Sequence, residues 1–213
     1  MLRNMLADLM KERTWVLHKE AERTGVVSDM LNGRLTQPAY LCYIRNLLPI
    51  YQSLEARPTT LVTFPQMQDM FDSRLFRSDS LSCDINEITK TKPWKPSPIF
   101  ECTDAYCAAI NTAHVQGDPK ILGHIYVRYL GDLNGGQVLK RLIAKHLNLP
   151  NSQLTFYEFP LIDTLVTFRT EFRNLLNGVR LSEIDQSRAI QGAIDAFAFN
   201  IDLSKCVKEF SGS

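Results

Sequence analysis

The chain has 213 residues, of which 45% are hydrophobic and 22% charged, as is usual for a globular protein with one sizeable core. Its net charge of +1 does not indicate a nucleic-acid partner. Five widely spaced cysteines without a C-x-x-C pair predict neither a disulfide framework nor a zinc site, and favour reduced thiols in a cytosol.

The N-terminus has Asp8, Lys11 and Glu12 where a signal peptide requires an uninterrupted apolar run. No later segment approaches the 18 or so consecutive apolar residues of a membrane span. We therefore expect a cytoplasmic protein that is neither secreted nor anchored in a membrane.

Apolar residues recur at helical spacing along most of the chain, and the pattern predicts six helices. They run from the N-terminus to about Gly25, from Thr36 to Ala56 with a kink at Pro49, from about Ile99 to Val115, from Pro119 to before Pro150, from about Leu161 to Asn177, and from Ser182 to Lys205.

Start signals support three of these helices: Thr36 before Pro38, Asp118 before Pro119, and a capping box at Ser182 and Asp185. Between the helices, "MQDMFDSRLF" predicts a short amphipathic turn or two, "KTKPWKPSPIF" an irregular segment, and "LTFYEF" a few extended residues. No repeat or linker divides the chain. The sequence predicts one all-α domain over residues 1–213.

One helix contains the unusual stretch "YVRYLGDLNGGQVLK", with Gly131, Gly135 and Gly136 inside six positions. Each interior glycine costs a helix roughly 1 kcal/mol relative to alanine. The surrounding residues match neither a phosphate-binding loop nor a dinucleotide fingerprint. Two interpretations are open, namely close packing of two helices, and a large flat ligand lying against bare backbone. Asp132 favours the ligand, because a carboxylate in an otherwise apolar helix needs hydrogen bonds, often through water.

The same stretch closely resembles the signature of the haem oxygenase family, and the resemblance extends from the His18 helix to "AFAFNIDL" near the C-terminus. It implies an all-α, multi-helix fold in which haem b is sandwiched between an N-terminal proximal helix and a glycine-kinked distal helix. Haem would be both prosthetic group and substrate. With O2 and electrons from an external donor it would be cleaved to biliverdin, carbon monoxide and ferrous iron.

Four histidines are candidate iron ligands: His18, His114, His124 and His146. His18 points away from the apolar stripe of its helix, which is also the pattern of an ordinary surface histidine. His124 lies two turns before Gly131 on nearly the same face, so spacing does not choose between them. The family pattern does, because His18 in "LHKEAE" matches the proximal ligand. His124 and His146 are then interpreted as structural or surface residues.

The resemblance also implies roles around the haem. Glu22, one turn after His18, would orient the imidazole. Lys11, Arg169 and Arg173, with Tyr126, would bind the propionates. Gly131, Gly135 and Gly136 would face the haem plane. Asp132 would hold an ordered water chain that delivers protons. Arg128 is interpreted as an external salt-bridging residue.

The sequence departs from the family pattern at Asn134, where serine is usual, and at Gly123, where alanine is commoner. The family's animal members have a membrane tail that is missing here, which fits a bacterial enzyme or one of the plastid stroma. We expect a monomer that takes electrons from ferredoxin, flavodoxin or a reductase, with Lys11, Lys140, Arg141 and Lys145 on the docking face. The alternatives are a haem carrier or sensor without turnover, which would not need Asp132, and a thiaminase-like enzyme with a catalytic cysteine.

Overall fold

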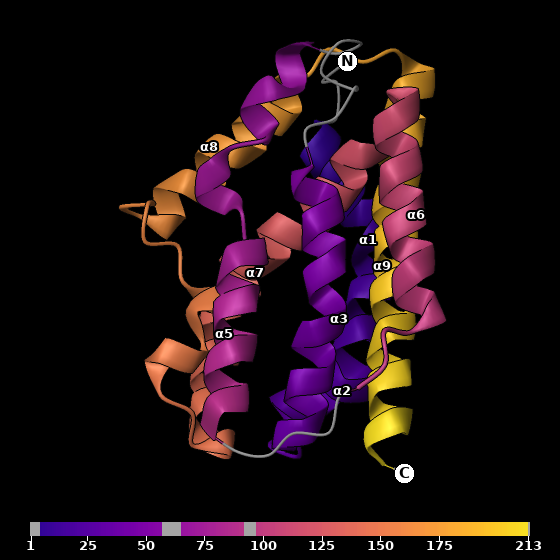
Figure 1. The fold of residues 1–213 in the computed structure, drawn as a ribbon. Helices are drawn as coiled ribbons and strands as arrows, with labels where there is room; N and C mark the ends of the chain where they lie inside the picture. The colour runs from indigo at the N-terminus through magenta and orange to yellow at the C-terminus, as the bar shows by residue number, and fades with distance from the viewer. Residues whose placement is uncertain (1–4, 57–64, 92–96, 213) are drawn as a thin grey trace.

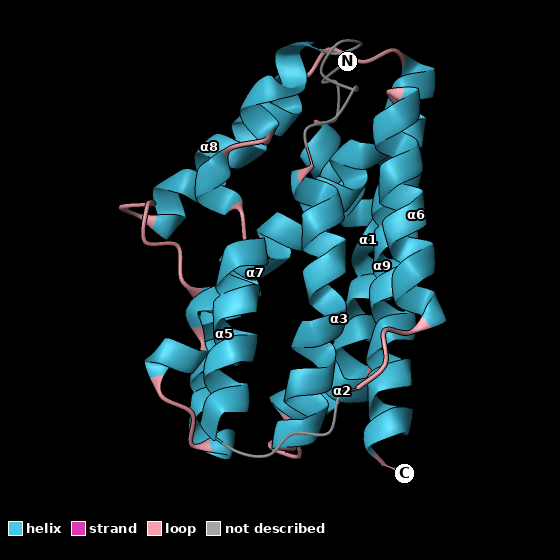
Figure 2. Ribbon diagram, in the orientation of Figure 1, coloured by secondary structure: helices cyan, strands magenta, loops and turns pink. Residues whose placement is uncertain are grey.

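The computed structural model describes residues 5–56, 65–91 and 97–212, and every regular element within them is helical (Figures 1 and 2). The α-helices are α1 (Leu6–Arg23), α2 (Gly25–Leu31), α3 (Gln37–Glu55), α5 (Ser78–Thr91), α6 (Glu101–Gln116), α7 (Lys120–Leu147), α8 (Leu165–Gly178) and α9 (Glu183–Ser211). Short 3-10 helices are η1 (Pro65–Met70), η2 (Ser73–Leu75), η3 (Asn151–Gln153) and η4 (Thr155–Tyr157). No described helix is both long and apolar enough to cross a bilayer.

The six predicted helices are confirmed, with ends that differ by a few residues. The first stops where Gly25 takes a left-handed φ of 56°, and α2 follows it directly. A Cβ at Gly25 would lie 2.1 Å from the Ser204 carbonyl oxygen of α9. Glycine is therefore needed here both for its backbone conformation and for the close approach of α9.

The three predicted caps are also present. The Thr36 hydroxyl accepts a hydrogen bond from the Ala39 N–H at 3.3 Å, and Ser182 Oγ accepts one from the Asp185 N–H at 3.1 Å. The Ser182 hydroxyl itself donates to the Asp185 carboxylate at 2.8 Å. The carboxylate of Asp118 accepts from the Lys120 N–H at 3.0 Å at the start of α7.

Two parts of the middle and later chain differ from the sequence predictions. Helix α5 was not predicted. The "LTFYEF" stretch, expected to be extended, contains η4, because buried Asp84 of α5 accepts hydrogen bonds from the Thr155 and Phe156 N–H groups at 2.8 and 2.9 Å. In the stretch expected to be irregular, residues 97–100 form a loop and residues 92–96 lie outside the described part.

Helix α7 packs most extensively against α9, and two glycines allow the close contact. A Cβ at Gly123 of α7 would lie 2.1 Å from the Ala193 nitrogen, and one at Gly192 of α9 would lie 2.1 Å from the Lys120 carbonyl oxygen. In Figure 1, α6 and α9 lie on one side of the view, while α5 and α8 lie on the other. The buried apolar residues of these helices form one hydrophobic core.

Candidate functional site

Helices α1 and α7, with the middle of α9, enclose a slot made of two adjoining hollows. Their volumes are about 330 and 360 Å³, each within the range of roughly 300–1,000 Å³ that is usual for ligand pockets. The residues that line both hollows are His18, Val127, Gly131, Gly135 and Phe197. The slot therefore lies between the two segments that the sequence predicted to face a flat ligand.

The glycines of α7 leave bare backbone on one wall of this slot. A Cβ built at Gly131 or at Gly135 would meet nothing within 4 Å, and one at Gly136 would meet only the Tyr157 ring at 3.5 Å. Close helix packing, the other interpretation of this cluster, is therefore wrong for Gly131 and Gly135. It applies instead to Gly123, where a Cβ would overlap with the α9 backbone.

His18 of α1 lines the same slot, and its side chain is 48% exposed. Its ring stacks on Trp15 and meets Phe197 of α9 edge-on, with ring centroids 6.0 and 5.9 Å apart. The Nδ1 atom lies 3.6 Å from the Glu22 carboxylate, slightly beyond hydrogen-bond distance. A hydrogen bond from Lys19, at 2.8 Å, lowers the pKa of Glu22 and keeps that carboxylate ionised beside the imidazole.

The other histidines do not line either hollow of the slot. His124, the competitor for the iron, is 1% exposed against Tyr106, and burial lowers the pKa of its imidazole to about 4. His114 is buried, with Nε2 3.0 Å from the Ser53 carbonyl oxygen, and His146 is exposed. Of the four, only His18 has access to the slot.

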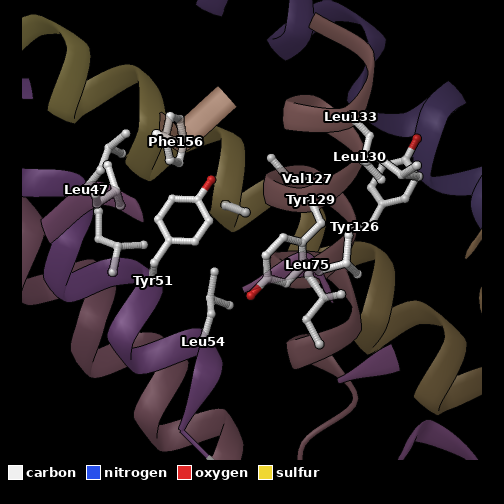
Figure 3. Close-up of a cluster of buried hydrophobic side chains, with 14 of the residues drawn as sticks. Leu47, Tyr51, Leu54, Leu75, Tyr126, Val127, Tyr129, Leu130, Leu133 and Phe156 are labelled. Carbon is white, nitrogen blue, oxygen red and sulfur yellow. The ribbon is translucent and has the colours of Figure 1, made fainter. Parts of the chain in front are cut away.

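Asp132 lies on the slot side of α7 and belongs to a buried network. Its carboxylate accepts a hydrogen bond from the Tyr51 hydroxyl of α3, and the same hydroxyl accepts from Arg128 at 2.7 Å (Nη2) and 3.1 Å (Nε). Arg128 also donates to the Asn200 side chain of α9 at 2.6 Å. Figure 3 shows the Tyr51 ring directed from α3 toward α7, with Tyr129 and Phe156 beside it.

Burial determines the electrostatics of this network. The Asp132 side chain is 12% exposed, and its removal from water raises the pKa of the carboxyl, while Arg128 and the Tyr51 hydrogen bond oppose that rise. Burial also raises the pKa of Tyr51 well above its usual range, so the hydroxyl remains a proton donor. Asp132 is the carboxyl group of this network, and it lines the second hollow.

The prediction that Arg128 is an external residue is wrong. Arg128 is 8% exposed, and its guanidinium lies between Tyr51, Asn200 and Asp132, at 3.8 Å from the last. Every residue of α7 from Ile121 to Leu130 is buried, so helical periodicity does not distinguish an inner from an outer face there. Tyr51, Asn200 and Phe197 were missed because no local pattern connects them to the glycine cluster.

The predicted propionate-binding residues are partly brought together. Lys11, Tyr126 and Arg173 line the first hollow. The guanidinium of Arg173 pairs with Asp8 of α1 at 2.6 Å. Arg169 does not line either hollow, and it donates instead to the Asn134 side chain of α7 at 3.1 Å. Asn134, the residue that replaces the usual serine, therefore connects α7 to α8 at the edge of the slot.

The fold and the slot define an all-α protein with a slot that has an imidazole on one wall and bare helix backbone on another. Residues 4–205 match the sequence model of the family described as Heme oxygenase. The Guillardia theta protein named Heme oxygenase is 32% identical over 93% of this chain and 84% of its own length. The Synechocystis protein named Heme oxygenase 1 is 28% identical over 93% of this chain and 82% of its own length.

A solved structure agrees with the sequence comparison. The crystal structure of Synechocystis heme oxygenase-1 in complex with heme superimposes on this protein with a TM-score of 0.88 and 27% identity. The match covers 96% of this chain and 93% of the Synechocystis chain. The chain belongs to the heme oxygenase family.

Proposed function

We propose that this enzyme holds haem in the slot between α1 and α7, with His18 as the ligand of the iron. Membership of the family makes the reaction the oxidative cleavage of haem to biliverdin, with release of carbon monoxide and ferrous iron. Bound haem supplies both the iron that binds oxygen and the porphyrin ring that is cut. The protein's contribution is to bind, orient and supply protons.

The observation that carries the proposal is the bare backbone of Gly131 and Gly135, which line the same hollows as the imidazole of His18. A side chain at either glycine would occupy the space where a macrocycle must lie against α7. The second hollow is largely apolar, with Val127, Leu139 and Phe197 in its lining, and suits the faces of a porphyrin, whereas the first hollow has polar side chains as well.

Glu22 is the residue proposed to orient the ligand. Its carboxylate lies 3.6 Å from Nδ1 of His18, and a small closing movement gives a hydrogen bond from an N–H at that position. The proton on Nδ1 leaves the lone pair of Nε2 free for iron. Lys19 holds the other Glu22 oxygen at 2.8 Å, which limits the carboxylate to this side of the helix.

Cations at the edge of the slot are proposed to bind the haem propionates. Lys11 and Arg173 line the hollow, and the Tyr126 hydroxyl is a neutral donor beside them. Arg173 is already paired with Asp8 in an exposed ion pair, which contributes at most about 1 kcal/mol and is easily exchanged for a propionate. Arg169 is proposed as a second contact whose guanidinium is positioned by Asn134.

Asp132 is proposed as the residue that moves protons in the slot. It lines the second hollow. Burial raises the pKa of its carboxyl toward neutral pH, where such a group both takes up and releases a proton. Tyr51 and Arg128 fix its orientation, so that protons and ordered water are presented on one side only. A haem carrier has no use for this buried network, and for this reason turnover is the better proposal.

The electrons are proposed to come from an external protein such as ferredoxin, flavodoxin or a reductase. Arg141 and Lys145 are exposed on α7 and suit an acidic donor. Lys140 contributes little to such a face, because its side chain is 14% exposed and paired with Glu158.

The proposal is tested by loading the protein with haem and adding ascorbate in air. We expect the haem absorbance to disappear and biliverdin to form. In His18→Ala the imidazole spectrum should be lost and should return when free imidazole is added. His124→Ala is the matched control and should keep the wild-type spectrum. Persistent oxygenated haem without bilin would indicate a carrier, and an unchanged spectrum in His18→Ala would remove His18 as the ligand.

Asp132→Asn tests the second part. We expect haem affinity within about twofold of wild type, whereas biliverdin yield should fall at least about tenfold. A wild-type yield from this variant would exclude Asp132 from proton delivery.

A further inference from the structure

Two of the five cysteines lie in contact with each other, far from one another in the sequence. Sγ of Cys102, at the start of α6, is 3.3 Å from Sγ of Cys206 in the last part of α9. Both residues are half-buried, so small oxidants reach them from solvent. Neither residue lines the slot, and the reaction assigned to the protein does not use them.

The remaining three cysteines have no such arrangement. Cys42 is buried in the core, Cys83 is exposed on α5, and Cys107 lies elsewhere on α6. Cys102 and Cys206 are the only two of the five, all within the described residues, whose sulfur atoms are in contact. A disulfide requires the sulfur atoms to be about 2.05 Å apart, a distance that small rotations of two side chains reach from here.

We propose that Cys102 and Cys206 form a reversible oxidation site, at which hydrogen peroxide converts the two thiols to a disulfide that joins α6 to α9. The inference does not depend on haem or on the proposed role of the slot.

The disulfide needs one sulfur to attack the oxidant and the other to close the bond. The two Sγ atoms are 3.3 Å apart, so a sulfur oxidised first is already within reach of its partner. Burial, followed by the neighbouring Cys206, raises the pKa of Cys102 to about 12, which keeps the proton on Cys102 in the reduced pair.

The chemistry balances in two steps. The sulfur of Cys206 attacks one oxygen of hydrogen peroxide, the O–O bond breaks, and Cys206 sulfenic acid and one water are formed. The thiol of Cys102 then attacks the sulfenic sulfur, the S–OH bond breaks, and a second water leaves with the Cys102 proton. Two thiols are thereby oxidised to one disulfide while one peroxide is reduced to two waters, and a thiol reductant reverses the change.

A disulfide here has a clear mechanical consequence. It closes a loop between residues 104 positions apart, and long loops give the largest loss of entropy in the unfolded chain. It also fixes the C-terminal turns of α9, where Ser204 Oγ accepts from the Val27 N–H at 3.1 Å and donates to the Thr24 carbonyl at 2.9 Å. Oxidation would therefore hold α6, α9 and the α1–α2 junction together.

The test uses the full-length chain without haem, so that haem does not consume the peroxide. After brief treatment with hydrogen peroxide and alkylation of free thiols, peptide mass spectrometry should find a Cys102–Cys206 link. The thermal unfolding midpoint should rise by about 5–10 °C, and dithiothreitol should reverse both changes. Wild-type protein alone decides the linkage, so the result does not depend on how a variant folds.

Variants then assign the effect. Cys102→Ser and Cys206→Ser should lose both the link and the shift in the midpoint, while Cys83→Ser, the exposed control, should keep both. The proposal is overturned if both thiols remain open to alkylation after oxidation, if the link joins a different pair, or if the link forms without a rise in the midpoint.

Discussion

The hydroxyl of Tyr51 on α3 donates to the carboxylate of Asp132 on α7, across 81 positions of sequence. The only proton of that hydroxyl is thus committed to Asp132, while its oxygen accepts two hydrogen bonds from Arg128. One side chain therefore orients both charged groups of the network. Asp132 owes its fixed direction toward the slot to a residue that lies on another helix.

Tyr51→Phe should lower both stability and turnover. The change leaves Arg128 and Asp132 without their shared partner in a buried place, which costs about 1–3 kcal/mol in the free energy of unfolding. Without that constraint on Asp132, biliverdin formation should slow severalfold at unchanged haem affinity. Denaturant unfolding and single-turnover assays measure the two effects.

Tyr129→Phe is the matched control for this change. The Tyr129 hydroxyl is buried, and within the described part of the chain it has no hydrogen-bond partner. Its removal should therefore cost little and leave turnover unchanged. Equal effects of the two substitutions would contradict the role given to Tyr51.

Gly131→Ala should separate folding from haem binding. A methyl group there meets open space, so the gain in helix propensity should raise the free energy of unfolding by about 0.5–1 kcal/mol. The same methyl group should weaken haem binding by about tenfold, because it occupies the surface on which the macrocycle rests. Unfolding curves without haem and haem titrations provide both values.

Gly123→Ala should lower the free energy of unfolding and should not act on haem binding directly. Its methyl group would lie 2.1 Å from the Ala193 nitrogen, so the helices must move apart at a cost of about 1–3 kcal/mol or more. The distinction between a packing glycine and a binding glycine would be contradicted if Gly123→Ala were as stable as wild type and Gly131→Ala bound haem normally.

Asp8→Asn should strengthen haem binding. The substitution releases Arg173 from its exposed ion pair at 2.6 Å and makes the whole guanidinium charge available to a propionate. An exposed pair contributes up to about 1 kcal/mol, so affinity should rise by up to about fivefold. Glu12→Gln removes the same charge from an exposed position of α1 and should not change the affinity. Unchanged or weaker haem binding in Asp8→Asn would count against Arg173 as a propionate ligand.

Stability should fall in mild acid because of His124. The pKa of its imidazole is lowered from 6.5 to about 4, so the unfolded chain takes up a proton that the folded chain refuses. Stability is therefore lost as pH falls from about 6.5 toward 4, and His124 alone should account for about 2 kcal/mol between pH 7.5 and pH 5. Urea unfolding at the two values measures the loss.

His124→Gln should make that loss about 2 kcal/mol smaller, whereas His146→Gln, at an exposed position, should leave it unchanged. The same dependence on pH in both variants would show that another group is responsible.

The sequence predicted the long helices and their order, because their apolar spacing and caps are local signals. Helix α5 was missed. Its apolar residues Leu81, Ile85 and Ile88 are spaced for a helix, but they are surrounded by serine, threonine, aspartate and asparagine. Contact with α3 and η4, together with Asp84, holds it in place. Tertiary contacts of this kind leave no mark in a local pattern.

The candidate site shows the same division. Gly131, Asp132 and His18 could be proposed from a motif and a resemblance. The sequence prediction places Arg128 on the wrong side of its helix, and no local signal points to Tyr51. The partners in this network lie 72 to 81 positions apart, so only the packing of α3 and α9 on α7 brings them together.

The close backbone contact between α7 and α9 also determines which helices around the slot can move. At Gly123 and Gly192 main chain touches main chain, and no flexible side chain lies between them to absorb a displacement. These two helices should consequently shift as one block. We therefore expect substrate entry and bilin exit to require movement of α1 and α8, which are linked to each other by a surface ion pair and by a hydrogen bond from the Ala7 N–H to the Asn177 side chain.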